Sequence, residues 1–287
     1  MTAHHPNSPH ENEASLPLGK EVSYPRDYNP ALLFPIARAQ GRAQLGALAQ
    51  AIKLPFIGWD LWRGYELSWL KPSGLPATAI LKVWVPCDSP FIVESKSFKL
   101  YLNSLNHSVF DDTVTLLGCL ERDLNHAVGA PSRIALVLPA AFEQEPIEEL
   151  LTGCLDEQPV AITDYQPNAD LLNESTGPNL KTEHVFSRLL KSNCPVTGQP
   201  DWATLHIGYH GHSIDHAALL KYIVSYRDHQ GFHEQCVERI FCDIMDRCRP
   251  QSLSVYARYT RRGGMDINPW RATPGTQPPN LLRSAQQ

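Results

Sequence analysis

The sequence lacks any long apolar run, which excludes a helix that spans a membrane. The longest apolar runs, such as residues 135–138, are far shorter than the roughly 18 residues needed to cross a bilayer. The first 15 residues are polar and contain no apolar core of a secretory signal. We therefore expect a cytoplasmic protein that makes no contact with a membrane.

Charged residues are also scarce, and neither sign dominates. They make up 19% of the chain, hydrophobic residues make up 43%, and the formal net charge is −5. A chain this apolar forms a packed core rather than staying disordered throughout. The weakly acidic balance argues against bulk binding to nucleic acid, so we expect no direct nucleic-acid partner, although a local basic pocket is still compatible with it.

Several common motifs are absent. The seven cysteines include no CxxC pair, and their odd number without a signal peptide disfavours both a zinc knuckle and a disulfide framework. Neither GxGxxG nor GxxxxGK[ST] occurs, so nothing predicts a Rossmann fold or a P-loop. Proline is abundant instead, at 24 residues, and predicts many loops.

Two stretches of the chain carry the same order of hydrophobic patterns. Each predicts a strand, a pair of helices and a second strand, and the two copies are offset by about 120 to 125 residues. Two copies of one α+β unit explain this order. The expected strands are 79–85, 133–138, 203–209 and 253–259, and the expected helices are 97–106, 117–128, 184–191, 215–226 and 233–248.

The repeat predicts four segments. Residues 1–30 form a flexible lead, and residues 31–142 form the first unit. Residues 143–183, rich in Pro, Asn and Glu, form a linker, and residues 184–287 form the second unit.

Cys194 is the first candidate for chemistry. It lies in a polar, turn-rich loop that we expect between the helix at 184–191 and the following strand. Loops held by rigid elements are where nucleophiles are displayed. The carboxyl of Asp201 follows at the start of the strand. An incidental loop thiol is the alternative interpretation.

Two basic segments are candidate anion sites. Glu94 and Ser95 are suited to cap a helix, and Lys96 and Lys99 would share one face of it, where helix amides and two lysines can hold a phosphate. Residues 259–264 place adjacent arginines before two glycines at a strand end, a second possible phosphate contact. A solvated helix start and a solvated hairpin end are the respective alternatives.

The histidines give two further hypotheses. His210 and His212 would lie about 6.6 Å apart on one strand face and could share a zinc ion, whereas His206 is too far away from His210, and no third ligand is specified. His233 and Glu234 open a long helix and pair an imidazole with a carboxylate. Glutamate suits an edge with two adjacent N–H donors, as in guanine, although a glutamate at a helix start also simply favours the helix dipole.

Together these segments resemble the NADPH-dependent 7-cyano-7-deazaguanine reductases, the nitrile reductases of tRNA queuosine biosynthesis. Residues 94–104, 194–201, 232–234 and 258–264 carry the resemblance, which covers about residues 20–275. It is to the long form of the family and implies an α+β fold of two tandem tunnelling-fold units, each an antiparallel sheet with a helix pair on one face. We expect a homo-oligomer, with a homodimer favoured.

The resemblance also implies residue roles. Cys194 would add to the nitrile to form a thioimidate, Asp201 would donate a proton, and His233 would supply a later one. Asp201 would then have to be protonated, which needs a pKa raised by burial. No metal is implied. The implied substrate contacts are Val93, Glu94, Ser95, His233 and Glu234, and the implied NADPH contacts are Ser95, Lys96, Arg262 and Gly263.

Two rival functions remain open from the residues alone. One is a zinc-dependent tunnelling-fold enzyme that acts on a pterin or purine precursor through His210 and His212. The other is a hydrolase or amidotransferase that uses Cys194 with a histidine, or a module that only binds a purine.

Overall fold

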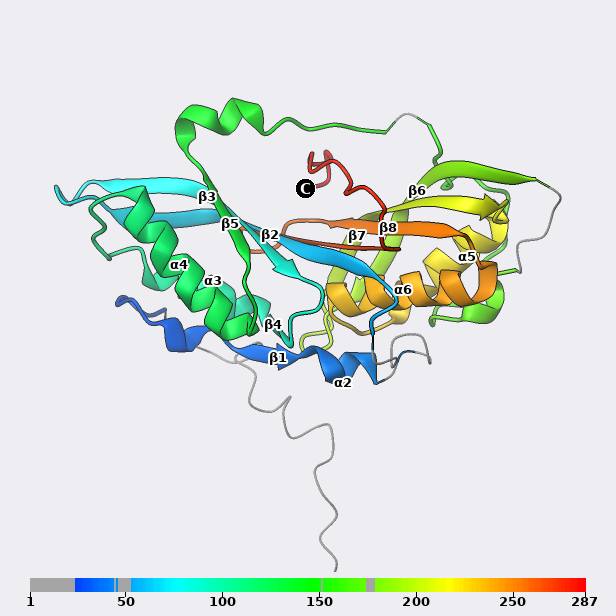
Figure 1. The fold of residues 1–287 in the computed structure, drawn as a ribbon, viewed down its shortest axis with the longest axis horizontal. Coiled ribbons are helices and arrows are strands. Elements are labelled where there is room, and N and C mark those ends of the chain that lie inside the picture. The colour runs from blue at the N-terminus through cyan, green and yellow to red at the C-terminus, as the bar shows by residue number, and fades with distance from the viewer. Residues whose placement is uncertain (1–23, 44, 46–52, 151, 174–178) are drawn as a thin grey trace, which may run out of the picture.

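One antiparallel sheet of seven strands forms the centre of the molecule in the computed structural model (Figure 1). The strand order is β5-β3-β2-β9-β8-β7-β6, and every neighbouring pair is antiparallel. The strands are β2 (Ile57–Leu70), β3 (Pro76–Pro86), β5 (Arg133–Val137), β6 (Leu180–Asn193), β7 (Pro200–His212), β8 (Ser252–Tyr259) and β9 (Met265–Ala272).

The structure describes residues 24–43, 45, 53–150, 152–173 and 179–287. The flexible lead expected over residues 1–30 lies outside the described residues as far as residue 23. No helix in the described part of the chain is both long and apolar enough to cross a bilayer.

Two helix pairs cover the same face of this sheet (Figure 1). One pair packs under the first three strands of the order above and the other under the last strands, so the predicted α+β fold with an antiparallel sheet and one helix pair per half is confirmed. A short sheet beside them pairs β1 (Pro35–Ala37) with β4 (Phe91–Val93). The helices are α2 (Arg38–Arg42), α3 (Ser95–Ser104), α4 (Thr113–Val128), α5 (His216–Ser225) and α6 (His233–Cys248), with short 3-10 turns at Pro30–Leu32, Pro139–Gln144, Ala169–Leu171 and Tyr226–Asp228.

The two halves share a core of a strand hairpin, two helices and a further strand, although β9 has no counterpart in the first half. The first helix of each pair has 10 residues and the second has 16. Each hairpin also contains one irregularity at the corresponding place, between Gly64 and Leu67 in β2 and between Ser187 and Leu190 in β6. These shared details support two copies of one unit. The units share a single sheet because β2 pairs with β9 along Ile57 to Gly64.

The helix expected at residues 184–191 is wrong, because this segment is part of strand β6. Its apolar residues Val185, Phe186, Leu189 and Leu190 have the spacing of a helical face. The β-bulge after Ser187 inserts one residue, which breaks the alternation of a regular strand and produces that spacing.

Strands β2 and β9 were not predicted. Every residue of β9 is buried, and Leu61, Trp62 and Arg63 in β2 are buried consecutively. The helices cover one face of these central strands, and the segment after β9 covers the other (Figure 1). The buried residues include Asp60, Arg63 and Asp266, and charged residues in a sequence normally indicate exposed positions.

Each half has its own hydrophobic core between helices and sheet. In α4 the residues Leu116, Leu120, Leu124 and Val128 recur every fourth position and are all buried. Burying each such side chain contributes about 1.5–3 kcal/mol. The second core holds the corresponding residues of α6, and Leu155 from the segment before β6 packs into it.

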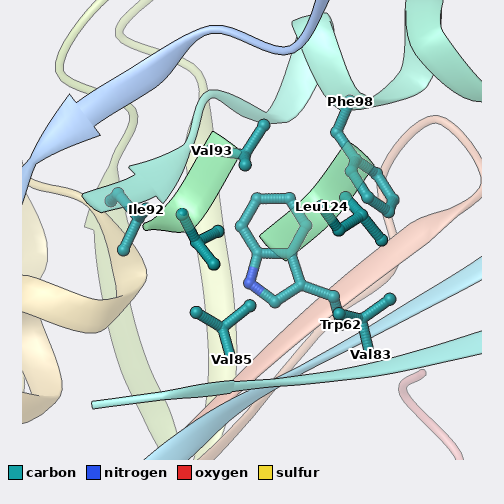
Figure 2. Close-up of a pocket in the computed structure, with 8 residues that line it drawn as sticks. Trp62, Val83, Val85, Ile92, Val93, Phe98 and Leu124 are labelled. Carbon is teal, nitrogen blue, oxygen red and sulfur yellow. The ribbon is translucent and has the colours of Figure 1, made fainter. Parts of the chain in front are cut away.

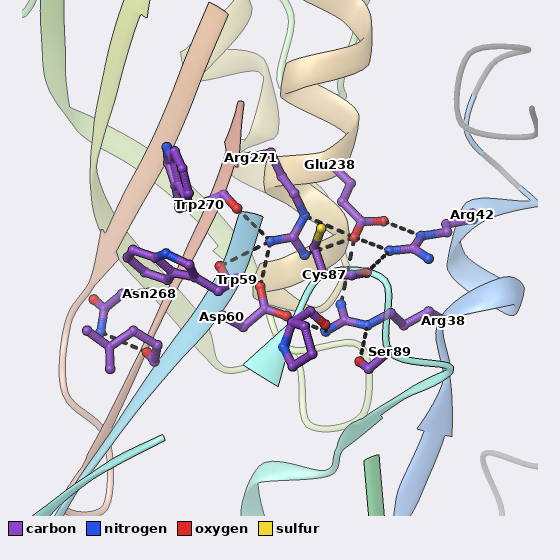
Figure 3. A network of polar contacts seen from close by, with 12 residues as sticks. Arg38, Arg42, Trp59, Asp60, Cys87, Ser89, Glu238, Asn268, Trp270 and Arg271 are labelled. Carbon is purple, nitrogen blue, oxygen red and sulfur yellow. Dashed lines mark hydrogen bonds and ion pairs between the residues drawn. The ribbon is translucent and has the colours of Figure 1, made fainter. Parts of the chain in front are cut away.

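A buried ionic network joins the two halves below the sheet (Figure 3). Arg271 of β9 contacts Asp60 of β2 at 2.8 Å and Glu238 of α6 at 2.9 Å. Arg38 reaches Asp60 at 2.5 Å, and Arg42 reaches Glu238 at 2.7 Å. The network therefore fixes α2, β2, β9 and α6 relative to one another beside the start of α6.

Candidate active site

A pocket lies where the two halves meet, on the helix side of the sheet. The N-terminal ends of α3 and α6, the loop between β6 and β7 and the turn after β8 all reach it. Its space is about 50 Å³, enough for a few water molecules, so a purine-sized ligand requires lining side chains to move apart. The lining residues are Trp62, Ile92, Val93, Ser95, Cys194, Pro195, Asp201, Gly231, Phe232, His233, Glu234, Arg262 and Ile267.

The β6–β7 hairpin brings Cys194 and Asp201 together. Asp201 is paired across the hairpin with Ser192, two residues before the thiol. The loop is closed by the Cys194 N–H donating to the Gln199 carbonyl at 2.8 Å and the Gly198 N–H donating to the Cys194 carbonyl at 2.9 Å. Cys194 is only 7% exposed, so a buried thiol faces the pocket from a rigid turn rather than from a loose loop.

The carboxylate of Asp201 contacts two basic side chains. Arg262 donates to its Oδ1, and His233 Nε2 lies 3.5 Å from its Oδ2. Burial is the largest influence and raises the pKa of Asp201, but the contacts with His233 and Arg262 together outweigh it, and the pKa is below its ordinary value. The expectation that burial leaves the pKa of Asp201 above its ordinary value is therefore wrong, because the His233 and Arg262 contacts outweigh burial.

Glu234 presents an unpartnered carboxylate oxygen to the pocket. Its side chain is 2% exposed, and Oε1 has no hydrogen-bond partner among the described residues. Burial raises the pKa of Glu234 to about 7, and the negative charge of Asp60 adds to this, while His233 and Arg38 oppose it. A buried acceptor without a donor costs free energy, and a ligand with N–H groups would remove that cost.

The residues at the start of α3 have two different roles, since one caps the helix and another lines the pocket. The carboxylate of Glu94 accepts from the N–H groups of Lys96 and Ser97 at 2.8 and 2.7 Å, so it caps the helix. Ser95 lines the pocket. Lys99 lies next to the turn after β8, because a Cβ added at Gly263 would sit 3.1 Å from its Nζ. The two basic segments of the sequence thus lie side by side.

Of the apolar wall of the pocket, the resemblance had implied Val93 but not Trp62, Ile92 or Ile267. Trp62, Ile92 and Val93 line both the pocket and a dry cavity of about 10 Å³ behind it (Figure 2). Trp62 comes from the unpredicted strand β2, and Ile267 on the other side comes from the unpredicted strand β9. Only the pairing of these two strands brings such residues to the site, so no local pattern could have indicated them.

Comparison with known proteins gives two matching family models. One, described as nitrile reductase, 7-cyano-7-deazaguanine-reductase N-term, matches residues 24–136, and the other, described as QueF-like protein, matches residues 200–277. A relative from Bordetella avium named NADPH-dependent 7-cyano-7-deazaguanine reductase is 54% identical over 96% of this chain and 99% of its own. The chain belongs to the 7-cyano-7-deazaguanine reductase family.

Other members of the reductase family match over similar lengths. A relative with the same name from Paraburkholderia phymatum is 51% identical over 94% of this chain and 98% of its own, and one from Stenotrophomonas maltophilia is 53% identical over 94% and 97%. The crystal structure of the archaeosine synthase QueF-Like in the apo form covers 36% of this chain at 16% identity with a TM-score of 0.31, too low for any inference here.

Among the described residues, Cys194 and His233 are the cysteine and histidine that line the pocket. His210 Nδ1 pairs with Thr182 Oγ1 at 2.9 Å, and no group of three or more His, Cys, Asp or Glu side chains in the described residues is arranged to hold a metal ion. Cys236 and Cys248 are buried on α6, as their apolar helical spacing predicted. The thiol that faces the pocket is Cys194.

Proposed function

We propose that this protein reduces the nitrile of 7-cyano-7-deazaguanine to a primary amine with NADPH, as a step of tRNA queuosine biosynthesis. The observation that carries the proposal is the meeting of a buried thiol, an acidic side chain and an unpartnered carboxylate in one pocket: Cys194, Asp201 and Glu234. Membership of the reductase family supports the reaction, and the position of these residues in one pocket supports their roles in it.

Glu234 anchors the deazaguanine ring in this proposal. The guanine-type edge carries two adjacent N–H donors, which match a carboxylate at hydrogen-bonding distance. Oε1 of Glu234 is buried and lacks a donor, and the apolar side chains of Trp62 and Val93 provide a flat wall for the ring. Ser95 and His233 lie beside it as further polar contacts. Glu94 contributes by fixing the start of α3.

Cys194 makes the nitrile reducible. Its thiolate adds to the nitrile carbon, one C–N π bond breaks, and the nitrogen takes a proton from Asp201, leaving a thioimidate. Substrate entry has to displace lining side chains, and only loss of both the His233 and the Arg262 contacts would leave burial to raise the pKa of Asp201, the direction an acid needs.

Reduction then takes place in two stages on the same carbon. The reduction requires two molecules of NADPH bound in turn, each of which would supply one hydride, the first to the thioimidate carbon and the second to the imine that follows. Between them the tetrahedral adduct expels the Cys194 thiolate, and His233 is positioned to give the proton that completes the amine. The imine hydrolyses in water, so the buried apolar wall protects it.

The basic residues around the turn after β8 fit the phosphates of the cofactor. Gly263 has a φ of 55° and leaves open the place beside Lys99 that a Cβ would fill. Arg262 is 36% exposed at the pocket and can turn toward a phosphate oxygen. Together with Ser95 and Lys96 at the start of α3, these residues would hold NADPH without the glycines of a Rossmann fold.

The test of the proposal is the substitution Cys194→Ala. We expect the wild-type protein to oxidise NADPH when 7-cyano-7-deazaguanine is added and the variant to lose this activity completely. Without NADPH, intact-mass spectrometry should show the wild-type chain gaining the mass of the nitrile and the variant gaining none. Cys154→Ala, at an exposed thiol, is the matched control. Unchanged turnover in Cys194→Ala would remove the mechanism.

We also propose the partners, the cellular location and the oligomeric state of the enzyme. The net charge of −5 fits a free deazapurine substrate rather than a nucleic acid, and the chemistry fits a cytoplasmic enzyme without membrane contact. We also propose a homo-oligomer, with a homodimer favoured, because strands β5 and β6 end the sheet with edges that a second copy can cover. Light scattering after size exclusion measures the oligomer directly.

A further inference from the structure

A second pocket lies on the opposite face of the sheet from the helices. It has a volume of about 270 Å³ and lies between strands β6 to β8 and the segment that follows β9. His184, His206, Tyr256 and Arg258 reach it from the strands, and Asn280 closes it from above. The sheet separates this pocket from Cys194, so its residues have no part in the proposed reaction.

Arg258 in this pocket is a buried cation whose charge is felt by Glu149 only from beyond ion-pair distance. It is 5% exposed, and its guanidinium donates to the amide oxygen of Asn280 at 2.5 Å. No carboxylate of the described residues forms an ion pair with it. The other fully buried arginines of the sheet differ, since Arg63 pairs with Asp266 and Arg271 pairs with Asp60. A buried charge without a partner is costly, so the site is incomplete as it stands.

Three potential donor atoms around the pocket lack any acceptor. Arg258 Nε, Tyr256 Oη and His206 Nε2 are buried and make no hydrogen bond with the described residues. They lie close together because His206 is directly paired with Tyr256 across β7 and β8, and Thr204, two residues earlier, is paired with Arg258. Burial and the nearby Arg258 lower the pKa of His206 to about 3, so the imidazole is neutral and can donate from Nε2.

We propose that this pocket binds a small oxyanion, a phosphate or a carboxylate, through Arg258, Tyr256 and His206. An anion supplies both features that the pocket lacks, a negative charge for the guanidinium and acceptors for three donors. The volume admits a small organic anion, and Leu150 and Pro279 in the wall would contact its carbon skeleton.

The experiment measures anion binding by calorimetry and by thermal unfolding of the full chain at constant ionic strength. Inorganic phosphate is the probe in one arm and succinate in the other, with chloride as the balancing salt. We expect saturable binding and a raised Tm with at least one probe. Arg258→Gln should abolish both effects, and Tyr256→Phe, which keeps the ring in place, should weaken binding about tenfold.

Two control variants locate the site. Arg133→Gln removes an exposed arginine that stacks on Trp84 in the neighbouring strands, and Arg262→Gln removes the arginine of the candidate active site. Arg133→Gln should bind the probe as the wild type does, and Arg262→Gln should lose at most any phosphate bound at the cofactor site while it keeps the binding that depends on Arg258. The proposal is overturned if neither probe binds the wild type, or if Tyr256→Phe binds with wild-type affinity. It is also overturned if Arg258→Gln changes the oligomeric state instead, because a second copy would then supply the counterion.

Discussion

The pKa values of two carboxylates in the candidate active site are shifted in opposite directions by their neighbours. Asp201 and Glu234 are both buried, and burial alone raises the pKa of each. Arg262 and His233 reverse this for Asp201, whereas Asp60 reinforces it for Glu234. These directions favour the carboxylate form of Asp201 and the protonated form of Glu234, so the roles of acid and anchor both require that substrate binding changes the surroundings of these side chains.

Replacing Asp201 tests its role as the acid. Asp201→Asn keeps the size of the side chain but removes the proton, so we expect kcat to fall by about 10²–10⁴ while the nitrile still binds. Steady-state NADPH oxidation and calorimetric binding measure the two effects. Asp111→Asn, at an exposed carboxylate, should leave both unchanged. A kcat within a few-fold of wild type in Asp201→Asn would assign the proton to another group.

Glu234 predicts how substrate affinity depends on pH. Its pKa in the free protein is about 7, and the donor edge of the substrate binds the carboxylate form. At pH 6 most of the Glu234 side chains are protonated and have to lose that proton before the nitrile binds. In the Cys194→Ala background we therefore expect the Kd of the nitrile to be about tenfold higher at pH 6 than at pH 8. Calorimetry at both pH values measures it.

The same anchor has a matched variant. Glu234→Gln should weaken binding by about 1–3 kcal/mol and flatten the pH dependence, because the amide does not titrate. A wild-type profile in this variant would mean that His233, Asp201 or another neighbour causes the dependence, and Glu234 would lose its assigned role.

At the scale of elements, the ionic network holds the start of α6 against the joint of β2 and β9. Glu238 lies one turn after Glu234 on α6 and accepts from Arg271 and Arg42. In Glu238→Gln, Asp60 would be the carboxylate that still pairs with the buried guanidinium groups of Arg38 and Arg271. We expect the free energy of unfolding to fall by about 3–5 kcal/mol, measured by urea denaturation.

An exposed glutamate provides the comparison for that variant. Glu157→Gln removes the same charge from the surface, where such changes have little effect on stability. A loss below about 1 kcal/mol in Glu238→Gln would mean that the network does not stabilise the joint.

At the scale of the whole molecule, the two units form one sheet and share one pocket. β2 pairs with β9 over eight residues of each strand, and the pocket takes Val93 from the first unit and Cys194 from the second. Neither unit has a complete site without the other. The fusion of two copies in one chain thus gives an asymmetric site from a repeated fold.

This continuity predicts one cooperative unfolding transition. Unfolding either half exposes the β2–β9 edge and breaks the buried network, so the halves should melt together. Differential scanning calorimetry should give one peak whose calorimetric and van't Hoff enthalpies agree for the folded unit present in solution. Two resolved peaks would show that the halves are independent domains joined by a weak interface.

The sequence by itself determined the elements whose apolar residues recur with the period of a helix or a strand. The stripe of α6 and the alternation in β7 and β8 predicted those elements correctly, and the long motifs around Cys194 and Glu234 indicated the family and the reaction. These features are local, because the apolar residues of a helix or a half-buried strand recur with a regular spacing within that segment.

Only the tertiary structure decided how these pieces combine. β2 and β9 bury charged residues such as Asp60, Arg63 and Asp266, and the bulge in β6 imitates a helical spacing. The pKa of Asp201 depends on Arg262, which is 61 positions away along the chain. Pairing, burial and charge contacts between distant residues are set by the packed whole, so no stretch of sequence states them alone.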